Sequence, residues 1–351
     1  MMKSAFYFLL KYHMRLVRQF FFSKSEIVGL DKLPIGNPII YSCNHQNAFL
    51  DALLMGEISP VKMSSMTRSD VFGNHAGKWF MDAVLMLPIY RMRDGFEQMA
   101  KNEEVFETVR SRLKKNQSVL IFSEGNHGND HFLRPISKGS SRLAFESQEK
   151  MMDQDIYVVP VGLNYYHHQV PGHKLSVVYG DPIRVKDYWE EYQAHNVRGA
   201  NHLKKQIDAG MKECLLIPEE DENYLVKRDL INRRNEHIPF HEFREKLKTM
   251  EGLQSRPPQR KGIRQIAEVL SLFNFGPALL LNKILAPIRD IVFQASIKWV
   301  FALFILPIWW LIIYGVCAAI WGWQVGLIAA GSCILAAFFR QKLVRLSTPS
   351  H

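Results

Sequence analysis

The chain has 351 residues, of which 47% are hydrophobic and 22% charged, and its formal net charge is +10. The composition is close to that of globular proteins, which excludes a disordered or collagen-like chain, and the length suits one large domain with an additional segment, or two domains. The positive charge favours an anionic partner: a nucleic acid, a membrane surface or a phosphorylated small molecule. The four cysteines are scattered and form no Cys-x-x-Cys pair, so we expect a reducing compartment.

The N-terminal segment Met1–Phe22 predicts a basic amphipathic helix that lies on a membrane surface. Apolar side chains recur along it and alternate with four cations, which are Lys3, Lys11, Arg15 and Arg18. A secretory signal peptide is not expected, because Lys11 interrupts the apolar run and no small-residue cleavage site follows. The alternative is an ordinary helix packed on a soluble core.

The middle of the chain predicts buried strands that alternate with helices. The predicted strands are Pro38–Cys43, Gln117–Phe122, Ile156–Leu163 and Ser176–Gly180. The spacing of apolar residues over Gly95–Lys115 predicts one of the intervening helices. This alternation indicates an α/β fold, in which helices flank a sheet.

The C-terminal part contains a long apolar run. No Asp, Glu, Lys, Arg or His occurs in the 41 residues from Trp299 to Phe339, and about 20 apolar residues suffice for one bilayer-spanning helix. We predict a transmembrane hairpin of Trp299–Ile320 and Gln324–Phe339, which turns near Gly322. Cations flank both ends of the run, which places these ends in the cytoplasm. The alternative is a pair of buried core helices.

His45 and Asp51 are candidate catalytic residues that follow the first predicted strand. A histidine can take and return a proton near neutral pH, and a nearby carboxylate can fix its tautomer. Residues six positions apart point about 240° apart on a regular helix. The pair can therefore meet only if the chain turns between them, and Asn47 is a suitable turn residue.

Two further segments carry candidate binding residues. Arg91 ends the apolar segment that begins at Leu87, and a guanidinium suits a phosphate. Glu124 and Gly125 directly follow the second predicted strand, and α/β sheets place ligands at this end of a strand. Arg134 and Lys138 add positive charge downstream. The sequence has no Gly-x-Ser-x-Gly nucleophile elbow.

Taken in order, these blocks resemble the glycerolipid acyltransferase family, which comprises the glycerol-3-phosphate and 1-acylglycerol-3-phosphate acyltransferases. The resemblance spans roughly residues 25–215. It rests on four blocks, which are His45-x5-Asp51, Pro88-Ile89-Tyr90-Arg91, Phe122-Ser123-Glu124-Gly125 and Val159-Pro160-Val161-Gly162.

The resemblance implies a role for each matching residue. His45 is expected to be the general base and Asp51 its orienting carboxylate, and Arg91 is expected near the acceptor's phosphate. Glu124 and Gly125 match the Glu-Gly pair of the third block. Pro160 matches the proline of the fourth block, and Arg68 resembles a basic residue that the family places between the first two.

This sequence departs from the family pattern at two places. Five residues separate His45 from Asp51, whereas most bacterial lysophosphatidate acyltransferases have four; five is more similar to glycerol-3-phosphate and dihydroxyacetone-phosphate acyltransferases. The third block usually reads Phe-Pro-Glu-Gly-Thr-Arg, and here Ser123, Asn126 and His127 replace its Pro, Thr and Arg. Arg134 or Lys138 is a candidate substitute for the missing arginine. The alternative is an acceptor without a phosphate, such as an amino-acid lipid.

The resemblance thus implies an integral membrane enzyme whose catalytic domain faces the cytoplasm. It would move a fatty acyl group from acyl-CoA or acyl carrier protein to a hydroxyl of glycerol-3-phosphate or 1-acylglycerol-3-phosphate, in phosphatidic acid synthesis. We expect no metal, no other cofactor and no nucleic-acid partner. The expected division is 1–30 (membrane-surface helix), 31–215 (acyltransferase domain), 216–297 (charged linker and interfacial region), 298–340 (hairpin) and 341–351 (tail). A protein that ends near Arg289 keeps these site residues and is expected to act on soluble donors.

Overall fold

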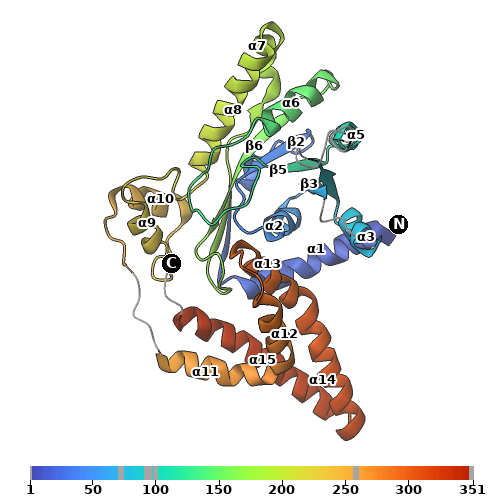
Figure 1. The fold of residues 1–351 in the computed structure, drawn as a ribbon, viewed down its shortest axis with the longest axis vertical. Helices are drawn as coiled ribbons and strands as arrows, with labels where there is room; N and C mark the ends of the chain where they lie inside the picture. The colour runs from blue at the N-terminus through green and yellow to red at the C-terminus, as the bar shows by residue number, and fades with distance from the viewer. Residues whose placement is uncertain (1, 70–74, 91–96, 98–101, 256–260, 348–351) are drawn as a thin grey trace.

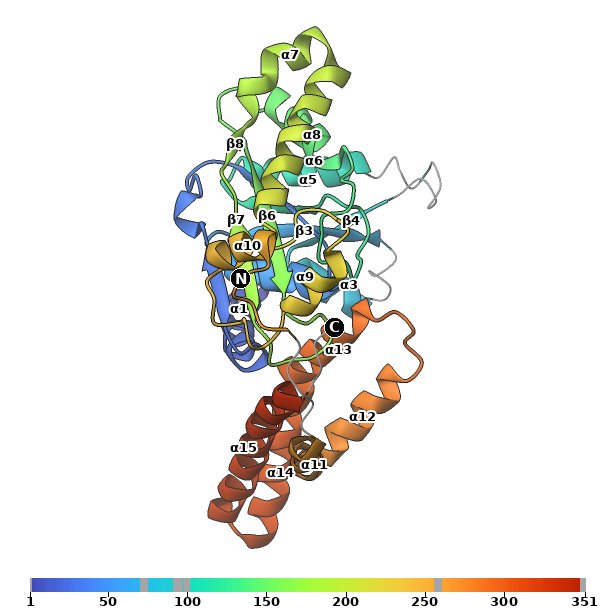
Figure 2. The same cartoon turned by 90° about the vertical axis from the view of Figure 1, so that its left-hand side faces the viewer.

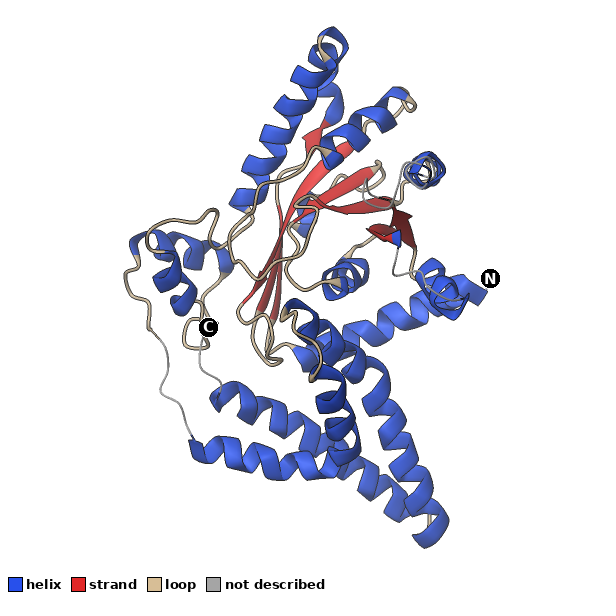
Figure 3. Cartoon of the chain, in the orientation of Figure 1, coloured by secondary structure: helices blue, strands red, loops and turns tan. Residues whose placement is uncertain are grey.

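The computed structural model describes residues 2–69, 75–90, 97, 102–255 and 261–347. It consists of a body built around one sheet and an all-helical arm that extends away from it (Figures 1 and 3). The strands are β1 (Ser25–Val28), β2 (Ile39–Cys43), β3 (Met63–Arg68), β4 (Met86–Ile89), β5 (Ser118–Phe122), β6 (Tyr157–Tyr165), β7 (Leu175–Tyr179) and β8 (Ile183–Arg184).

Helices of the body precede those of the arm along the chain. The body contains α1 (Met2–Phe21), α2 (Phe49–Ile58), α3 (His75–Ala83), α5 (Asn102–Leu113), α6 (Gly139–Glu149), α7 (Trp189–Ala194), α8 (Asn196–Glu213), α9 (Tyr224–Leu230) and α10 (Phe240–Thr249). The later helices are α11 (Lys261–Ser271), α12 (Phe275–Leu285), α13 (Val292–Val300), α14 (Leu306–Trp321) and α15 (Trp323–Ser347). A π-helical turn, Phe301–Ile305, joins α13 to α14.

The sheet is mixed, and its strand order is β1-β7-β6-β2-β5-β3-β4, with β8 pairing to β6. The run β6-β2-β5-β3-β4 is parallel, whereas β7 and β8 are antiparallel to β6. The four predicted strands are confirmed as β2, β5, β6 and β7. The α/β fold with helices flanking a sheet is also confirmed. We did not predict β1, β3, β4 and β8, because they are short or, like the Met-Ser-Ser-Met-Thr-Arg of β3, largely polar.

Helices cover both faces of the sheet, because successive side chains of a strand point to opposite faces. In β2, Ile39 and Tyr41 join a core that also contains residues of α1, α2 and α13. Ile40 joins a second core with residues of α5, α6 and α8. The predicted helix Gly95–Lys115 corresponds to α5, although residues 95, 96 and 98–101 lie outside the described part of the chain.

Helix α1 packs on the body more closely than a membrane-surface helix would. Its buried stripe enters the first core, and two of its four cations point inward: Arg18 forms a bidentate ion pair with Glu57 of α2 (2.6 and 3.3 Å), and Lys11 donates to the carbonyl of Ser59 (2.6 Å). The exposed side of α1 carries an apolar stripe of Phe8, Leu9, Tyr12, Leu16 and Phe20, together with the polar Ser4, Arg15 and Gln19. One side of α1 thus packs on the core, as the alternative expected. Contact of its other side with a membrane stays a prediction.

The arm contains three helices that are long and apolar enough to cross a membrane. They are Gly262–Leu285, Val292–Trp321 and Trp323–Leu346, which is one more than the sequence predicted. Gly322 turns the chain between α14 and α15 with φ of 93°, so the expected break in the apolar run is confirmed. Figure 2 shows α14 and α15 side by side, projecting from the body.

The start of the apolar run belongs to the core of the body. Trp299 is fully buried, and its ring lies 5.1 Å from that of Phe21 and 6.2 Å from that of Phe22. Leu303 is buried in the same core, and its carbonyl accepts a hydrogen bond from His13 of α1 (2.7 Å). The first helix of the expected hairpin thus begins inside the protein, because α13 fills the space between α1 and α2.

The far end of α15 is also tied to the body, through the buried carboxylate of Glu236. It accepts hydrogen bonds from His173 Nδ1 (3.0 Å) and the Lys174 N–H (3.2 Å), and it pairs with Arg345 near the end of α15. Burial alone would raise the pKa of Glu236, but the hydrogen bond from His173 and the charges of His173 and Arg345 outweigh it. The pKa therefore lies below its ordinary value of 4.5.

This network predicts an acid-sensitive contribution to stability. A carboxyl whose pKa is lower in the folded state stabilises the fold above its unfolded pKa, and this contribution is lost as the pH falls below about 4.5. Glu236→Gln should lower the free energy of unfolding at neutral pH by about 3 kcal/mol, because it breaks a buried pair. Thermal unfolding in detergent between pH 3.5 and 7 should show a shallower pH dependence for the variant. Equal pH dependence of both proteins would contradict this role.

Candidate active site

The parallel strands bring the candidate residues to one edge of the sheet. Cys43 at the end of β2 pairs in register with Phe122 at the end of β5, so His45 and Glu124 follow neighbouring strands at the same edge. Arg68 is the last residue of β3, which runs parallel to β5. Arg91 comes two residues after β4 and lies outside the described residues. This edge is where open α/β sheets bind ligands.

His45 and Asp51 form a hydrogen-bonded pair. The Nδ1 of His45 lies 2.8 Å from an Asp51 carboxylate oxygen; the Asp51 side chain is fully buried, and that of His45 is 16% exposed. The bond to a carboxylate makes Nδ1 the protonated nitrogen and leaves Nε2 as an acceptor. This is the arrangement that a histidine needs to act as a general base.

A tight turn makes this pairing possible. The N–H of Leu50 donates to the carbonyl of Asn47 (3.0 Å), and Ala48 has φ of 46° and ψ of −132°. These angles are those of the first central residue in a type II′ turn, a position that favours glycine. The expected turn between His45 and Asp51 is present, but the positive φ falls on Ala48 and not on Asn47.

Three further donors fix the Asp51 carboxylate. The N–H groups of Gln46 and Asn47 donate to the oxygen that pairs with His45, at 2.7 and 2.8 Å. The hydroxyl of Tyr165 donates to the other oxygen (2.7 Å). Burial, together with the charge of Asp51, raises the pKa of Tyr165 well above its usual range, so this hydroxyl remains a donor. Asp51 is thereby held as an oriented hydrogen-bond partner for the imidazole.

Two aromatic rings flank the imidazole of His45. Phe122 stacks on it, with centroids 3.9 Å apart and planes 11° apart. The ring of His127 meets it edge to face at 5.7 Å. His127 in turn lies 3.1 Å from the carboxylate of Asp290 and edge to face with Phe293 of α13. His127 thus links the His45 site to the C-terminal helices.

Glu124 and Arg134 hold the loop that follows β5 against His45. Glu124 accepts from the backbone N–H of His45 (2.8 Å) and from the N–H and guanidinium of Arg134 (3.0 and 2.8 Å). The guanidinium also donates to the carbonyls of His45, Asn126 and His127. Arg134 therefore has a structural role in this loop, and its expected contact with a phosphate stays a prediction.

Removing Arg134 should destabilise the site strongly. The Glu124 side chain is only 2% exposed, so Arg134→Ala leaves an unpaired buried carboxylate and should cost about 3–5 kcal/mol of unfolding free energy. Arg134→Lys keeps the charge without the planar fork and should lose less. Chemical unfolding in detergent measures both variants. An exposed ion pair contributes about 0–1 kcal/mol to stability. A loss of unfolding free energy below about 0.5 kcal/mol for Arg134→Ala would therefore contradict a buried ion pair with Glu124.

The other candidate residues take different positions. Gly125 has φ of 77°, and its N–H donates to the carbonyl of Phe122 (3.0 Å), which closes the turn after β5. Lys138 is exposed just before α6. Pro160 lies in the middle of β6, pairs with Ser42 of β2 and packs against Gly210 of α8. The roles that the resemblance implies for these residues stay predictions.

Several contacts of the site had no signal in the sequence. Tyr165 lies two residues beyond the end of the predicted third strand. Ser296, whose hydroxyl bonds to the turn Asn47–Leu50, belongs to a segment predicted as interfacial. Only His127 had a signal, because it replaces the arginine of the third block. Cys43 is fully buried and burial raises its pKa, so it lacks the features of a nucleophile.

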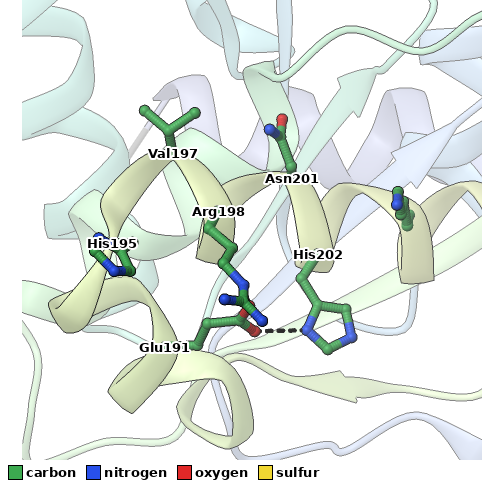
Figure 4. Close-up of a pocket in the computed structure, with 7 residues that line it drawn as sticks. Glu191, His195, Val197, Arg198, Asn201 and His202 are labelled. Atoms are coloured by element: carbon green, nitrogen blue, oxygen red, sulfur yellow. Dashed lines mark hydrogen bonds and ion pairs between the residues drawn. The ribbon is translucent and has the colours of Figure 1, made fainter.

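The site offers no cluster of metal ligands. Among the described residues, no group of three or more His, Cys, Asp or Glu side chains has the arrangement of a metal site. A surface hollow on α7 and α8 has a volume of about 750 Å³, and none of the candidate site residues lines it. Figure 4 shows its lining residues. Arg198 and His202, which line this hollow, both contact the carboxylate of Glu191.

Comparisons with known proteins give a consistent result. Residues 24–164 match the family model described as Acyltransferase. The chain is 31% identical over 125 residues to glycerol-3-phosphate O-acyltransferase 1 of Saccharomyces cerevisiae, covering 35% of this chain and 16% of the relative. It is 24% identical over 216 residues to a 1-acyl-sn-glycerol-3-phosphate acyltransferase of Cocos nucifera, covering 57% of this chain and 65% of the relative.

A solved structure also matches. It is a 1-acyl-sn-glycerophosphate acyltransferase from Thermotoga maritima, with a TM-score of 0.41 and 15% identity, covering 59% of this chain and 80% of the other. The match to the two sequence relatives described above spans less than two thirds of each relative's length.

Proposed function

On the premise that residues 24–164 are a domain of the acyltransferase family, we propose that this protein transfers a fatty acyl group from a thioester donor to a hydroxyl of a glycerol phosphate. The observation that carries the proposal is the hydrogen bond between His45 Nδ1 and the buried carboxylate of Asp51. It leaves Nε2 of His45 as a base at the ligand-binding edge of the sheet.

The proposed reaction has two proton transfers, both through Nε2 of His45. Nε2 takes the proton of the acceptor hydroxyl as the hydroxyl oxygen attacks the thioester carbonyl. Asp51 stabilises the imidazolium that forms. The tetrahedral intermediate then collapses, the carbon–sulfur bond breaks, and His45 returns its proton to the departing thiolate. The acceptor oxygen is the nucleophile, so neither a covalent acyl-enzyme nor a metal or other cofactor is needed.

The acceptor is proposed to be glycerol-3-phosphate or 1-acylglycerol-3-phosphate. Arg68 is the last residue of β3, and Arg91 follows β4 in the sequence, so a cation accompanies each of two parallel neighbouring strands, and a guanidinium suits a phosphate. The guanidinium of Arg134 already has several protein acceptors, which favours the other two arginines for this role.

We propose that the donor and the product reach the site from a membrane. Three apolar helices of the arm and the exposed apolar stripe of α1 support this. The cations that flank the apolar run favour a cytoplasmic position of the catalytic domain, and the proposed donor there is acyl-CoA or acyl carrier protein.

One assay tests the function and its acceptor. The purified full-length protein in detergent is given labelled acyl-CoA, or labelled acyl carrier protein, with glycerol-3-phosphate, 1-acylglycerol-3-phosphate or an amino-acid lipid. Transfer to one of the phosphorylated acceptors supports the proposal. Transfer only to the amino-acid lipid supports the alternative acceptor. Failure to acylate any of them with either donor would contradict an acyltransferase function.

A further inference from the structure

Helix α13 reaches the turn that brings His45 and Asp51 together. The hydroxyl of Ser296 donates to the carbonyl of Asn47 (2.6 Å) and accepts from the N–H of Leu50 (3.1 Å). These two groups are the first carbonyl and the last N–H of the turn, and they also bond to each other. Ser296 is fully buried, and it bridges both ends of the turn from about 250 residues further along the chain.

The turn has a reason to need this support. Ala48 adopts a positive φ that an L side chain seldom takes, and such strain costs about 1–3 kcal/mol. A turn of this length lets Asp51 face His45 across five intervening residues. If the turn relaxed, the Asp51 carboxylate would move relative to the imidazole, because Asp51 lies in the first turn of α2.

We propose that Ser296 is a positioning residue, which clamps the strained turn Asn47–Leu50 and so fixes the geometry of the His45–Asp51 pair. Ser296 does not touch His45, and it acts through the turn. The inference rests on the proposed function, since it concerns the base of that reaction. A displacement of about 1 Å in a catalytic group can lower the rate by about 10²-fold, so a small relaxation of the turn is sufficient.

Contacts on both sides of Ser296 along the chain support a fixed docking of α13. Before it, Asp290 bonds to His127, and Phe293 packs against the same ring. After it, the ammonium of Lys298 donates to the carbonyl of Gln169 (2.9 Å), and Trp299 is buried beside Phe21. Helix α13 is therefore anchored along its length and can hold the Ser296 hydroxyl in one place.

The test compares the full-length wild-type protein with Ser296→Ala, using labelled acyl-CoA and the preferred glycerol phosphate. We expect kcat to fall about 10-fold or more, while KM for both substrates changes less than about threefold. The matched control is Ser332→Ala in α15. Among the described residues, that hydroxyl bonds only to the carbonyl of Ile328 in its own helix, so its removal should leave kcat within about twofold.

Two additional variants separate positioning from a merely structural role. In an Asp51→Ala background, Ser296→Ala should change kcat less than about twofold, because the geometry that it protects is already lost. Adding Ala48→Gly to Ser296→Ala should recover part of the lost rate, because glycine takes the positive φ without strain. If Ser296→Ala does not fold, Ser296→Cys retains the size and a weak donor and should have an intermediate kcat.

The outcomes distinguish the two proposals. If the wild-type protein shows no transfer, the proposed function is wrong, and with it the assignment of Ser296. If the wild-type protein is active and depends on His45, but Ser296→Ala keeps more than half of kcat, only the clamp is wrong. Effects of Ser296→Ala and Asp51→Ala that multiply fully would also overturn the clamp.

Discussion

Replacing His45 by alanine is expected to lower kcat by about 10²–10⁴-fold, the usual share of a general base. The imidazole Nδ1 is held by Asp51 at 2.8 Å, and Nε2 is the base that the proposed reaction requires. His45 is partly exposed, and Asp51 keeps three other hydrogen-bond donors when the imidazole is removed, so the loss should come from chemistry with little change in folding. Initial rates with labelled acyl-CoA, together with thermal unfolding, measure the two effects separately.

A second histidine–carboxylate pair provides the control. His202 lies 2.6 Å from Glu191 on the α7 and α8 surface, in the hollow that contains none of the candidate site residues (Figure 4). His202→Ala should keep at least half of the wild-type kcat. A His45→Ala protein that also keeps more than half would show that His45 is not the base.

Ending the chain after Arg289 is expected to abolish activity, even on soluble short-chain donors. The sequence alone favours the opposite expectation, because every predicted site residue lies before this point. The structure shows that the missing segment completes the core, since it supplies Trp299 and Leu303, both buried between α1 and α2, and also Ser296. Loss of one buried tryptophan alone costs about 3–5 kcal/mol, a large part of a typical domain's 5–15 kcal/mol.

A slightly longer protein tests this explanation. A chain that ends after Ile305 keeps α13 and the π-helical turn but lacks α14 and α15. It should therefore retain the Ser296 and Trp299 contacts. We expect clearly more activity than in the shorter protein, at least about a tenth of the wild-type rate, which is the loss expected when one positioning contact is removed. The comparison uses short-chain acyl-CoA in detergent, so membrane binding does not limit the rate. Equal activity of both truncated proteins would contradict a role for α13 in the site.

Local pattern was sufficient to predict the central sheet. Strands β2, β5, β6 and β7 are mostly apolar and buried on both faces, so they are visible in the sequence as short apolar runs without tertiary information. The polar β3 could not be recognised in this way, because its place between β5 and β4 defines it as a strand more than its residues do. The turn at Gly322 is also visible in the sequence, because one glycine between two tryptophans in an apolar run is a local signal of a turn.

The candidate site shows a similar division. The order of short motifs after predicted strands pointed to His45, Asp51 and Glu124, because parallel strands bring their carboxyl ends to one edge. Sequence alone could not show that Arg134 is engaged by Glu124 and three carbonyls, since the loop that brings them together is held by non-local hydrogen bonds.

By itself, the sequence determined the α/β class, the apolar C-terminal run and the candidate catalytic pair, because each depends on residues close together in the chain. The tertiary structure decided what surrounds that pair. Tyr165 reaches Asp51 from a strand more than 100 residues away, and Ser296 reaches the turn beside it from about 250 residues away. Tertiary packing also turns the Arg18 side chain inward and buries Trp299. Such contacts arise when separate elements pack on one sheet, and local sequence patterns do not reveal which faces will meet.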